Sequence, residues 1–246
     1  ALPRPISADS KTRIFSCKRS SIKREKEGIM RMEPQEPKHI LCYGDSNTFG
    51  TNPTHCPIRH PLHVRWTGRL QSMLGPNYRL IEEGMGGRST VWDDPLEPGR
   101  NGLTFLPVAL QSHRPLDLVI LSLGTNDCKS IFRASPRVIA RGVERLIETI
   151  QTFPYGEGLR VPKILLVSPI HMGPEIDRSE YASFDAESGE RVKGLAAQYA
   201  ASAEKYGCAF LNAAEVAKPG PDQLHMDAEG HRALAEALAP LVRSLI

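Results

Sequence analysis

Short apolar runs alternate along this chain with longer segments of helical periodicity, and this alternation limits the folds that it can adopt. The run at residues 118–121 is continuously apolar, which indicates a strand covered on both faces. Strands of this kind separated by helices predict a five-stranded parallel sheet in a three-layer α/β/α domain with right-handed crossovers. The predicted strands are residues 39–43, 78–82, 118–123, 164–168 and 209–212, and the predicted helices are residues 66–74, 103–112, 138–152, 192–206 and 228–245.

The composition fits one folded domain that lies outside the membrane. A chain of 246 residues with 40% hydrophobic content can bury one sizeable core. No apolar run approaches the ~18 residues that a membrane-spanning helix needs, and the first residues carry no apolar signal core. The cysteines are odd in number and widely spaced, which indicates free thiols in a reducing compartment and predicts a cytoplasmic location. They are Cys17, Cys42, Cys56, Cys128 and Cys208.

Positive charge is concentrated at the beginning of the chain. Residues 1–39 carry a net charge of +5, although the whole chain carries only +3, so the remainder is weakly acidic. This segment has few aromatic residues, interspersed acids and no amphipathic period, which is typical of a solvated, disordered segment. We therefore divide the chain into a basic extension, residues 1–37, and a single domain, residues 38–246, and expect neither nucleic acid nor membrane as a partner. We hypothesise that the native chain starts at Met30 or Met32, with residues 1–29 as a leader.

The first apolar run stops abruptly on Gly44-Asp45-Ser46. This pattern indicates a buried strand that enters a tight turn, and the carboxyl end of a parallel strand is where α/β proteins bind ligands. A serine held there on rigid backbone, beside free amide groups, is well placed to act as a nucleophile. Gly-Asp-Ser is also common in ordinary turns, in which Asp45 bonds to the backbone. The residues that follow the other strands therefore decide between these two interpretations.

The later strands and the last loop supply the groups that acyl transfer requires. The Gly86-Gly87 turn follows the second strand and lets a backbone N–H approach a ligand closely. Gly124-Thr125-Asn126-Asp127 follows the third strand and offers a carboxamide donor. Near the carboxyl end, Asp222 precedes His225 by three residues, and a carboxylate bonded to an imidazole leaves its other nitrogen as a base. The Gly-x-Ser-x-Gly pattern of α/β-hydrolases is absent around Ser46.

Together these four segments resemble the ordered blocks of the SGNH (GDSL) hydrolase superfamily, from about residue 38 to the end of the chain. The residues from Val64 to Gly68, from Ile81 to Gly84 and from Gly124 to Lys129 are similar to its bacterial arylesterase/acyltransferase branch. The resemblance implies a flavodoxin-like sheet, esterase activity on small acyl esters through an acyl-enzyme, some acyl transfer to alcohols, and a homo-oligomer. In this chain Glu82-Glu83 stands where the family commonly has Asn before the glycine turn.

The resemblance also implies a role for each matching residue. Ser46 is expected to attack the ester, His225 to act as the base, and Asp222 to orient His225. The oxyanion hole is expected to consist of the backbone N–H groups of Ser46 and Gly87 and the side chain of Asn126. The expected partner is a small ester substrate, and we expect no dissociable cofactor.

Several further residues admit both a functional and a structural interpretation. Trp66 and Lys129 are candidates for the mouth of the substrate pocket, with core and surface roles as the alternatives. Asp227 is predicted to cap the last helix, with His231 on the surface of that helix. The loops at residues 51–65 and 171–189 leave strand ends and are expected to form pocket walls or subunit contacts. No metal site is expected from the histidines and cysteine of the first loop, since they lack a second arm of ligands; they are His55, Cys56, His60 and His63.

Other functions remain open on the sequence alone. A carbohydrate deacetylase, a lysophospholipase or a thioesterase would use the same residues. A protein of a different class, which binds an ester or glycan without cleaving it, would keep the fold but lack an activated serine.

Overall fold

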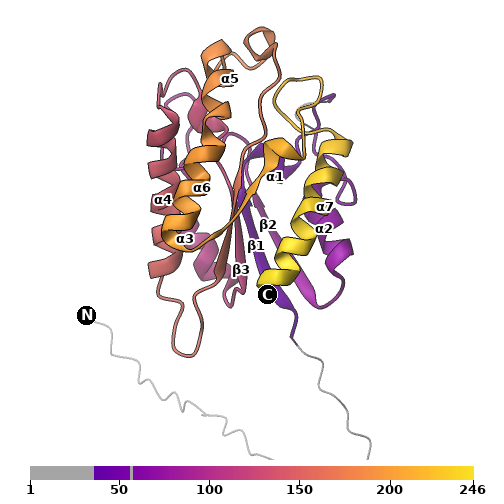
Figure 1. Ribbon diagram of the computed structural model, residues 1–246, viewed down its shortest axis with the longest axis vertical. Coiled ribbons are helices and arrows are strands. Elements are labelled where there is room, and N and C mark those ends of the chain that lie inside the picture. The colour runs from indigo at the N-terminus through magenta and orange to yellow at the C-terminus, as the bar shows by residue number, and fades with distance from the viewer. Residues whose placement is uncertain (1–35, 56–57) are drawn as a thin grey trace, which may run out of the picture. The chain divides into compact units, whose positions relative to one another are not determined.

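The computed structural model describes residues 36–55 and 58–246, which include a five-stranded, entirely parallel sheet with the strand order β2-β1-β3-β4-β5 (Figure 1). The predicted strands are confirmed, with ends that differ by at most two residues. The strands are β1 (Lys38–Gly44), β2 (Tyr78–Gly84), β3 (Leu118–Ser122), β4 (Lys163–Ser168) and β5 (Ala209–Asn212).

Helices cover both faces of the sheet, as the three-layer prediction requires. Helices α2 and α7 pack together on one face, and α3, α4 and α6 lie on the other (Figure 1). The segment predicted as one helix over residues 192–206 is divided at Gly194, where a Cβ atom would meet the ring of Pro136 at 2.8 Å. The helices are α1 (Ser46–Phe49), α2 (Trp66–Leu74), α3 (Gly102–His113), α4 (Pro136–Thr152), α5 (Ala186–Lys193), α6 (Leu195–Tyr206) and α7 (Ala228–Leu245), with short 3₁₀ turns η1 (Asn126–Cys128), η2 (Ile176–Arg178) and η3 (Ala213–Glu215).

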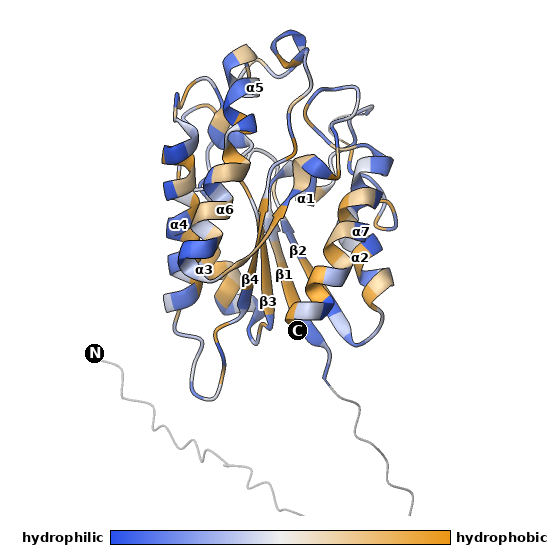
Figure 2. Cartoon of the chain, in the orientation of Figure 1, coloured by the Kyte–Doolittle hydropathy of each residue, from blue (hydrophilic) through white to orange (hydrophobic). Residues whose placement is uncertain are grey.

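The continuously apolar strands contribute to a core on each side of the sheet. Along β1, Ile40 packs with α2 and α7, whereas Leu41 packs with the opposite layer, and Ile120 and Val119 divide in the same way along β3. Successive side chains of a strand point to opposite faces, so a strand covered on both faces must be apolar throughout. Figure 2 shows these hydrophobic strands between helices whose outer surfaces are polar. Truncating one such buried aliphatic side chain to alanine typically costs about 2–5 kcal/mol.

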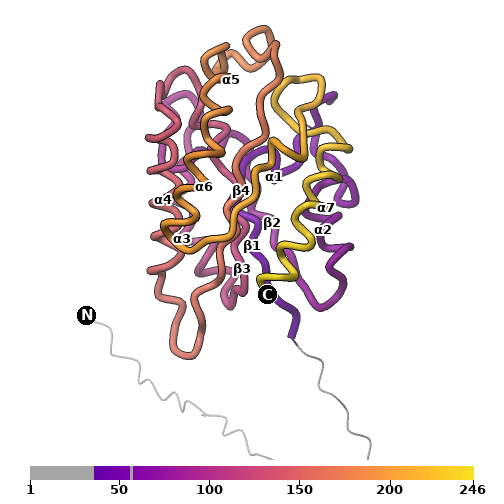
Figure 3. Tube along the Cα trace, in the orientation of Figure 1, coloured from indigo at the N-terminus to yellow at the C-terminus, as the bar shows by residue number. Residues whose placement is uncertain are grey.

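Two glycines allow α1 to lie directly across the carboxyl ends of β1 and β2. A Cβ atom on Gly44 would lie 2.0 Å from Thr48 Oγ1, and one on Gly84 would lie 2.1 Å from the backbone nitrogen of Phe49. Side chains at these positions would therefore push the short helix away from the sheet. The loops that follow β4 and β5 meet at the same end of the sheet (Figure 3), where Gly173 N–H donates to the carbonyl of Gln223.

Some predictions fall on residues that the structure does not describe. The basic extension lies outside the described residues except for residues 36 and 37, as do Met30, Met32, Cys17 and Cys56. Cys42, Cys128 and Cys208 form no disulfide bonds. Within residues 36–55 and 58–246, no helix is long and apolar enough to cross a membrane.

Candidate active site

Ser46 is the first residue of α1 and lies on the turn that ends β1. The carboxylate of Asp45 caps this short helix and accepts a hydrogen bond of 2.9 Å from the backbone nitrogen of Asn47. Gly50 ends the helix with φ at 87°, a left-handed conformation that glycine adopts readily. The prediction that Asp45 is a turn residue is confirmed. Its burial raises the pKa of its carboxyl group.

Asp222 and His225 form a close pair in the loop before α7. The Nδ1 atom of His225 lies 2.6 Å from Asp222 Oδ2, while Asp222 Oδ1 accepts from the backbone nitrogens of Leu224 and His225 at 3.0 and 2.8 Å. Burial alone would raise the pKa of Asp222, but the hydrogen bonds from His225 and the two amides bring it below its ordinary value. The carboxylate is therefore ionised and can only accept, so Nδ1 carries the proton and Nε2 is the free base.

Asn47 joins the serine turn to the histidine loop. Its side-chain oxygen accepts from the backbone nitrogen of Met226 at 2.9 Å, and its side-chain nitrogen donates to the carbonyl of Leu224 at 3.4 Å. These two bonds enclose His225, the residue between them. The neighbour of Ser46 in sequence thus fixes the position of His225. The sequence analysis missed Asn47, because nothing in the sequence indicates a contact across almost 180 residues.

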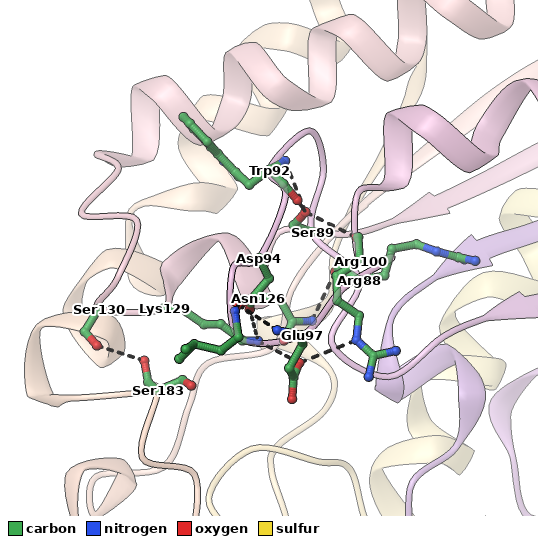
Figure 4. Close-up of polar contacts among 11 residues, drawn as sticks. Arg88, Ser89, Trp92, Asp94, Glu97, Arg100, Asn126, Lys129, Ser130 and Ser183 are labelled. Carbon is green, nitrogen blue, oxygen red and sulfur yellow. Dashed lines mark hydrogen bonds and ion pairs between the residues drawn. The ribbon is translucent and has the colours of Figure 1, made fainter.

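Two of the three groups expected to form the oxyanion hole lie on adjacent loops. Gly87 is in a turn with φ at 73° after β2, and Asn126 begins η1 after β3. Asn126 Nδ2 donates to the carbonyl of Arg88 at 3.1 Å, which ties the two loops together (Figure 4). A second tie is Asp127, which accepts from the backbone nitrogen of Thr90, and its burial raises its pKa to about 6.

A cavity of about 460 Å³ brings these groups together. Ser46, Gly87, Asn126 and His225 all contribute to its walls, whereas Asp222 lies behind His225. The lining is part apolar and part charged. The full set is Ser46, Phe49, Thr51, Gly86, Gly87, Glu97, Arg100, Asn126, Lys129, Glu180, Tyr181, Ala182, Ser183, Phe184, Leu224 and His225.

Lys129 lines this cavity, and its charge is neutralised there. Its buried Nζ atom lies 2.7 Å from Asp94 Oδ2 and 3.1 Å from Glu97 Oε2 (Figure 4). Burial would raise the pKa of Asp94, but the hydrogen bond from Lys129 brings it below its usual range. The Glu97 carboxylate also lies 3.5 Å from Arg100 Nε, and both side chains approach Gly87. A balanced ionic wall therefore borders the expected oxyanion hole.

Trp66 does not line the cavity, so this expectation from the sequence is wrong. It begins α2 and is 1% exposed within the core between that helix and the sheet. The expected surface position of His231 is also wrong, since this residue is fully buried and its Nδ1 accepts from the backbone nitrogen of Trp66 at 3.3 Å. The cap is confirmed, because Asp227 accepts from the first amides of α7.

His60, Glu82 and Glu83 have structural partners. Among residues 36–55 and 58–246 no group of three or more His, Cys, Asp or Glu is arranged to hold a metal ion. His60 packs edge-on against His231, with ring centroids 5.3 Å apart.

Glu82 accepts two hydrogen bonds from Arg65, at 2.8 and 2.9 Å. Glu83 lies 2.8 Å from His113. The carboxylates that replace the family's usual Asn therefore contact basic side chains, those of Arg65 and His113.

Tyr181 is a second residue that the sequence analysis missed. Its hydroxyl contacts both Asp222 and His225, from a loop about 40 residues earlier in the chain. The sequence carries no signal for this contact, since a lone tyrosine in an irregular loop has no periodic pattern.

Comparison with known proteins agrees with this geometry. The model of the GDSL-like Lipase/Acylhydrolase family matches residues 42–233. The native M. smegmatis aryl esterase is 39% identical over 85% of this chain and all of its own, with a TM-score of 0.80. Est24, a carbohydrate acetylesterase from Sinorhizobium meliloti, is 38% identical with the same coverage and a TM-score of 0.79. A comparison with curated proteins found no match.

The family model covers more than half of the chain, and both of these structures are aligned over their whole length. The fold agrees with them. The chain therefore belongs to the GDSL-like lipase/acylhydrolase family, the SGNH hydrolases, and is a carboxylic-ester hydrolase.

Proposed function

We propose that the protein is a serine esterase that hydrolyses small acyl esters, with Ser46, His225 and Asp222 as its catalytic triad. The observation that carries the proposal is the Asp222–His225 contact of 2.6 Å beside a cavity that Ser46 and His225 share. Ser46 Oγ attacks the ester carbonyl while its proton passes to His225 Nε2. The same nitrogen returns that proton to the departing alcohol. Water then releases the acid by the same two proton transfers.

The oxyanion that forms in each step needs donors fixed before the reaction begins. We assign this role to the backbone N–H groups of Ser46 and Gly87 and to the side chain of Asn126. A carboxamide nitrogen carries two protons, and Asn126 uses one for the carbonyl of Arg88, so the other is available to the substrate. The left-handed turn at Gly87 supports its role, because only a glycine is relaxed there.

The walls of the cavity favour a short acyl group. Phe49, Phe184 and Leu224 offer apolar contacts, but the neutralised wall of Lys129, Glu97 and Arg100 closes the side next to Gly87. Extending an acyl chain against these partly exposed ionic groups would remove hydration from them without replacing it. Acetyl to butyryl groups fit this environment. The similar proteins, an aryl esterase and a carbohydrate acetylesterase, are consistent with a small acyl group on either an aryl or a sugar alcohol.

The test is a series of p-nitrophenyl esters from two to twelve carbons, with labelling by a fluorophosphonate. We expect the highest kcat/KM for acetyl to butyryl esters and labelling that Ser46→Ala abolishes. Ser244→Ala, at an exposed serine of α7, is the matched control and should label as the wild type does. Activity that rises with chain length would favour a lysophospholipase or thioesterase. An unlabelled wild type would favour a non-catalytic binding protein.

The acyl-enzyme could also pass its acyl group to an alcohol in place of water. We propose this as a side activity of the same site. Hydrolysis of p-nitrophenyl acetate in the presence of increasing ethanol measures it, since ethyl acetate appears at the expense of acetate. Acetate as the only acyl product at every ethanol concentration would rule it out.

A further inference from the structure

The hydroxyl of Tyr181 lies at the contact between the acid and the base of the proposed triad. It donates a hydrogen bond of 3.1 Å to Asp222 Oδ2 and lies 3.2 Å from His225 Nδ1. Its ring stands edge-on to the imidazole, with centroids 5.4 Å apart and an angle of 76° between the planes. One side chain thus contacts both members of the pair.

The donors and acceptors at this contact have one consistent arrangement. Asp222 is ionised, so its Oδ2 atom accepts from both Tyr181 and His225 Nδ1. The phenolic proton points to the carboxylate, and the lone pairs of the phenolic oxygen then face the proton on Nδ1. Donors also reach Asp222 Oδ1 from the backbone, so every direction around the carboxylate has a partner. The hydroxyl therefore restricts both the carboxylate rotamer and the tilt of the imidazole.

The loop that carries Tyr181 also holds the triad loop at a second point. Gln223 lies between Asp222 and His225 with φ at 69°, a conformation that is uncommon outside glycine. Its backbone carbonyl accepts a hydrogen bond of 2.8 Å from the backbone nitrogen of Gly173. Its side-chain oxygen accepts one of 3.2 Å from the backbone nitrogen of Glu175. The loop after β4 therefore supports the uncommon backbone of the triad turn and, through Tyr181, its side chains.

We propose that Tyr181 is a positioning residue that holds the Asp222–His225 pair in the orientation from which His225 Nε2 serves Ser46. This inference rests on the proposed function. Without the hydroxyl, the imidazole keeps a single acceptor on Nδ1 and gains freedom to tilt about it. The free energy of a hydrogen bond to a charged group corresponds to a factor of about ten or somewhat more in an equilibrium or rate constant. We therefore expect kcat to fall by about tenfold. Substrate binding should not change, because the hydroxyl faces the pair.

The test compares the wild type with Tyr181→Phe and with Tyr155→Phe. Tyr155 is the matched control, because its hydroxyl also makes one buried hydrogen bond, to the carbonyl of Ile150 at 3.0 Å, and it does not line the cavity. With p-nitrophenyl acetate, Tyr181→Phe should lower kcat by about tenfold with an unchanged KM. Tyr155→Phe should keep both constants. A Tyr181→Phe enzyme with wild-type kcat, or one in which only KM changes, overturns the proposal.

A second measurement separates positioning from a general loss of stability. The Nδ1 proton of His225 should give a far-downfield proton resonance, as protons in short bonds to carboxylates do. In the wild type it should show a nuclear Overhauser effect to the Tyr181 ring, and in Tyr181→Phe its shift should move while Tyr155→Phe leaves it unchanged. A wild type that is not labelled at Ser46 would overturn the proposed function. Absence of the Overhauser effect in a protein that is labelled would overturn the role of Tyr181.

Discussion

At the scale of single residues, Asn126 tests the assignment of the oxyanion hole most directly. Its carboxamide is buried, held by the carbonyl of Arg88, and lines the same cavity as Ser46. If its second proton meets the oxyanion, Asn126→Ala should lower kcat by about 10²–10³, which corresponds to ~2.7–4 kcal/mol, with little change in KM. Steady-state kinetics with p-nitrophenyl acetate measure this. An effect confined to KM would show that Asn126 binds substrate and does not stabilise the oxyanion.

A matched carboxamide substitution controls for lost stability. Asn212 is also a hydrogen-bonded carboxamide at a strand end: it caps η3 and accepts from the hydroxyl of Ser168 at 3.0 Å. Unlike Asn126, it does not line the cavity. Asn212→Ala should therefore lower the melting temperature without changing kcat.

At the scale of elements, the bond between α1 and the loop before α7 determines whether the nucleophile and the base stay together. Asn47→Leu removes both bonds of the carboxamide while it keeps the branching of the side chain, and it leaves the amide of Met226 and the carbonyl of Leu224 buried. Each unsatisfied group costs about 1–3 kcal/mol, so we expect a lower melting temperature. Fluorophosphonate labelling of Ser46 should also slow, since His225 is no longer fixed beside it. Labelling at the wild-type rate would show that other contacts suffice to hold the histidine.

The same elements show what the sequence could predict. Periodicity located the strands and most helices, since a strand with two covered faces must be apolar throughout, as Val119 and Ile120 are. The motifs located Ser46, Asn126 and His225, because each follows a strand end or lies in the loop before the last helix. Periodicity located α2 correctly at Trp66–Leu74, but the assignment of Trp66 to the pocket mouth was wrong, because α2 buries its first residue against the sheet. Asn47 and Tyr181 act through contacts that only the folded chain creates.

At the scale of the whole molecule, His231 should make stability depend on pH. Burial, and then the nearby cations His60, Arg69 and Arg65, lower its pKa from 6.5 to about 3. Below pH 6.5, His231 therefore binds a proton in the unfolded chain but not in the folded protein. The free energy of unfolding consequently decreases as the pH falls. At pH 5 this amounts to about 2 kcal/mol relative to pH 7.

Asp127 has the opposite effect on the pH dependence of stability. We therefore predict that the slope of stability against pH changes sign when His231 is replaced. The pKa of Asp127 is raised from 3.8 to about 6, so near pH 5 the folded protein binds a proton that the unfolded chain does not bind. This proton stabilises the fold, and about 1 kcal/mol of that stabilisation is lost as the pH rises from 5 to 7. The wild type should therefore gain a little stability over this range. His231→Gln keeps an acceptor for the amide of Trp66 but removes the contribution of His231 to the pH dependence. The contribution of Asp127 remains, so the stability of this variant should fall as the pH rises. Urea unfolding at pH 5, 6 and 7 measures both slopes. His231→Gln combined with Asp127→Asn should remove both of these contributions to the slope. A His231→Gln protein that keeps the wild-type slope would contradict the role of His231.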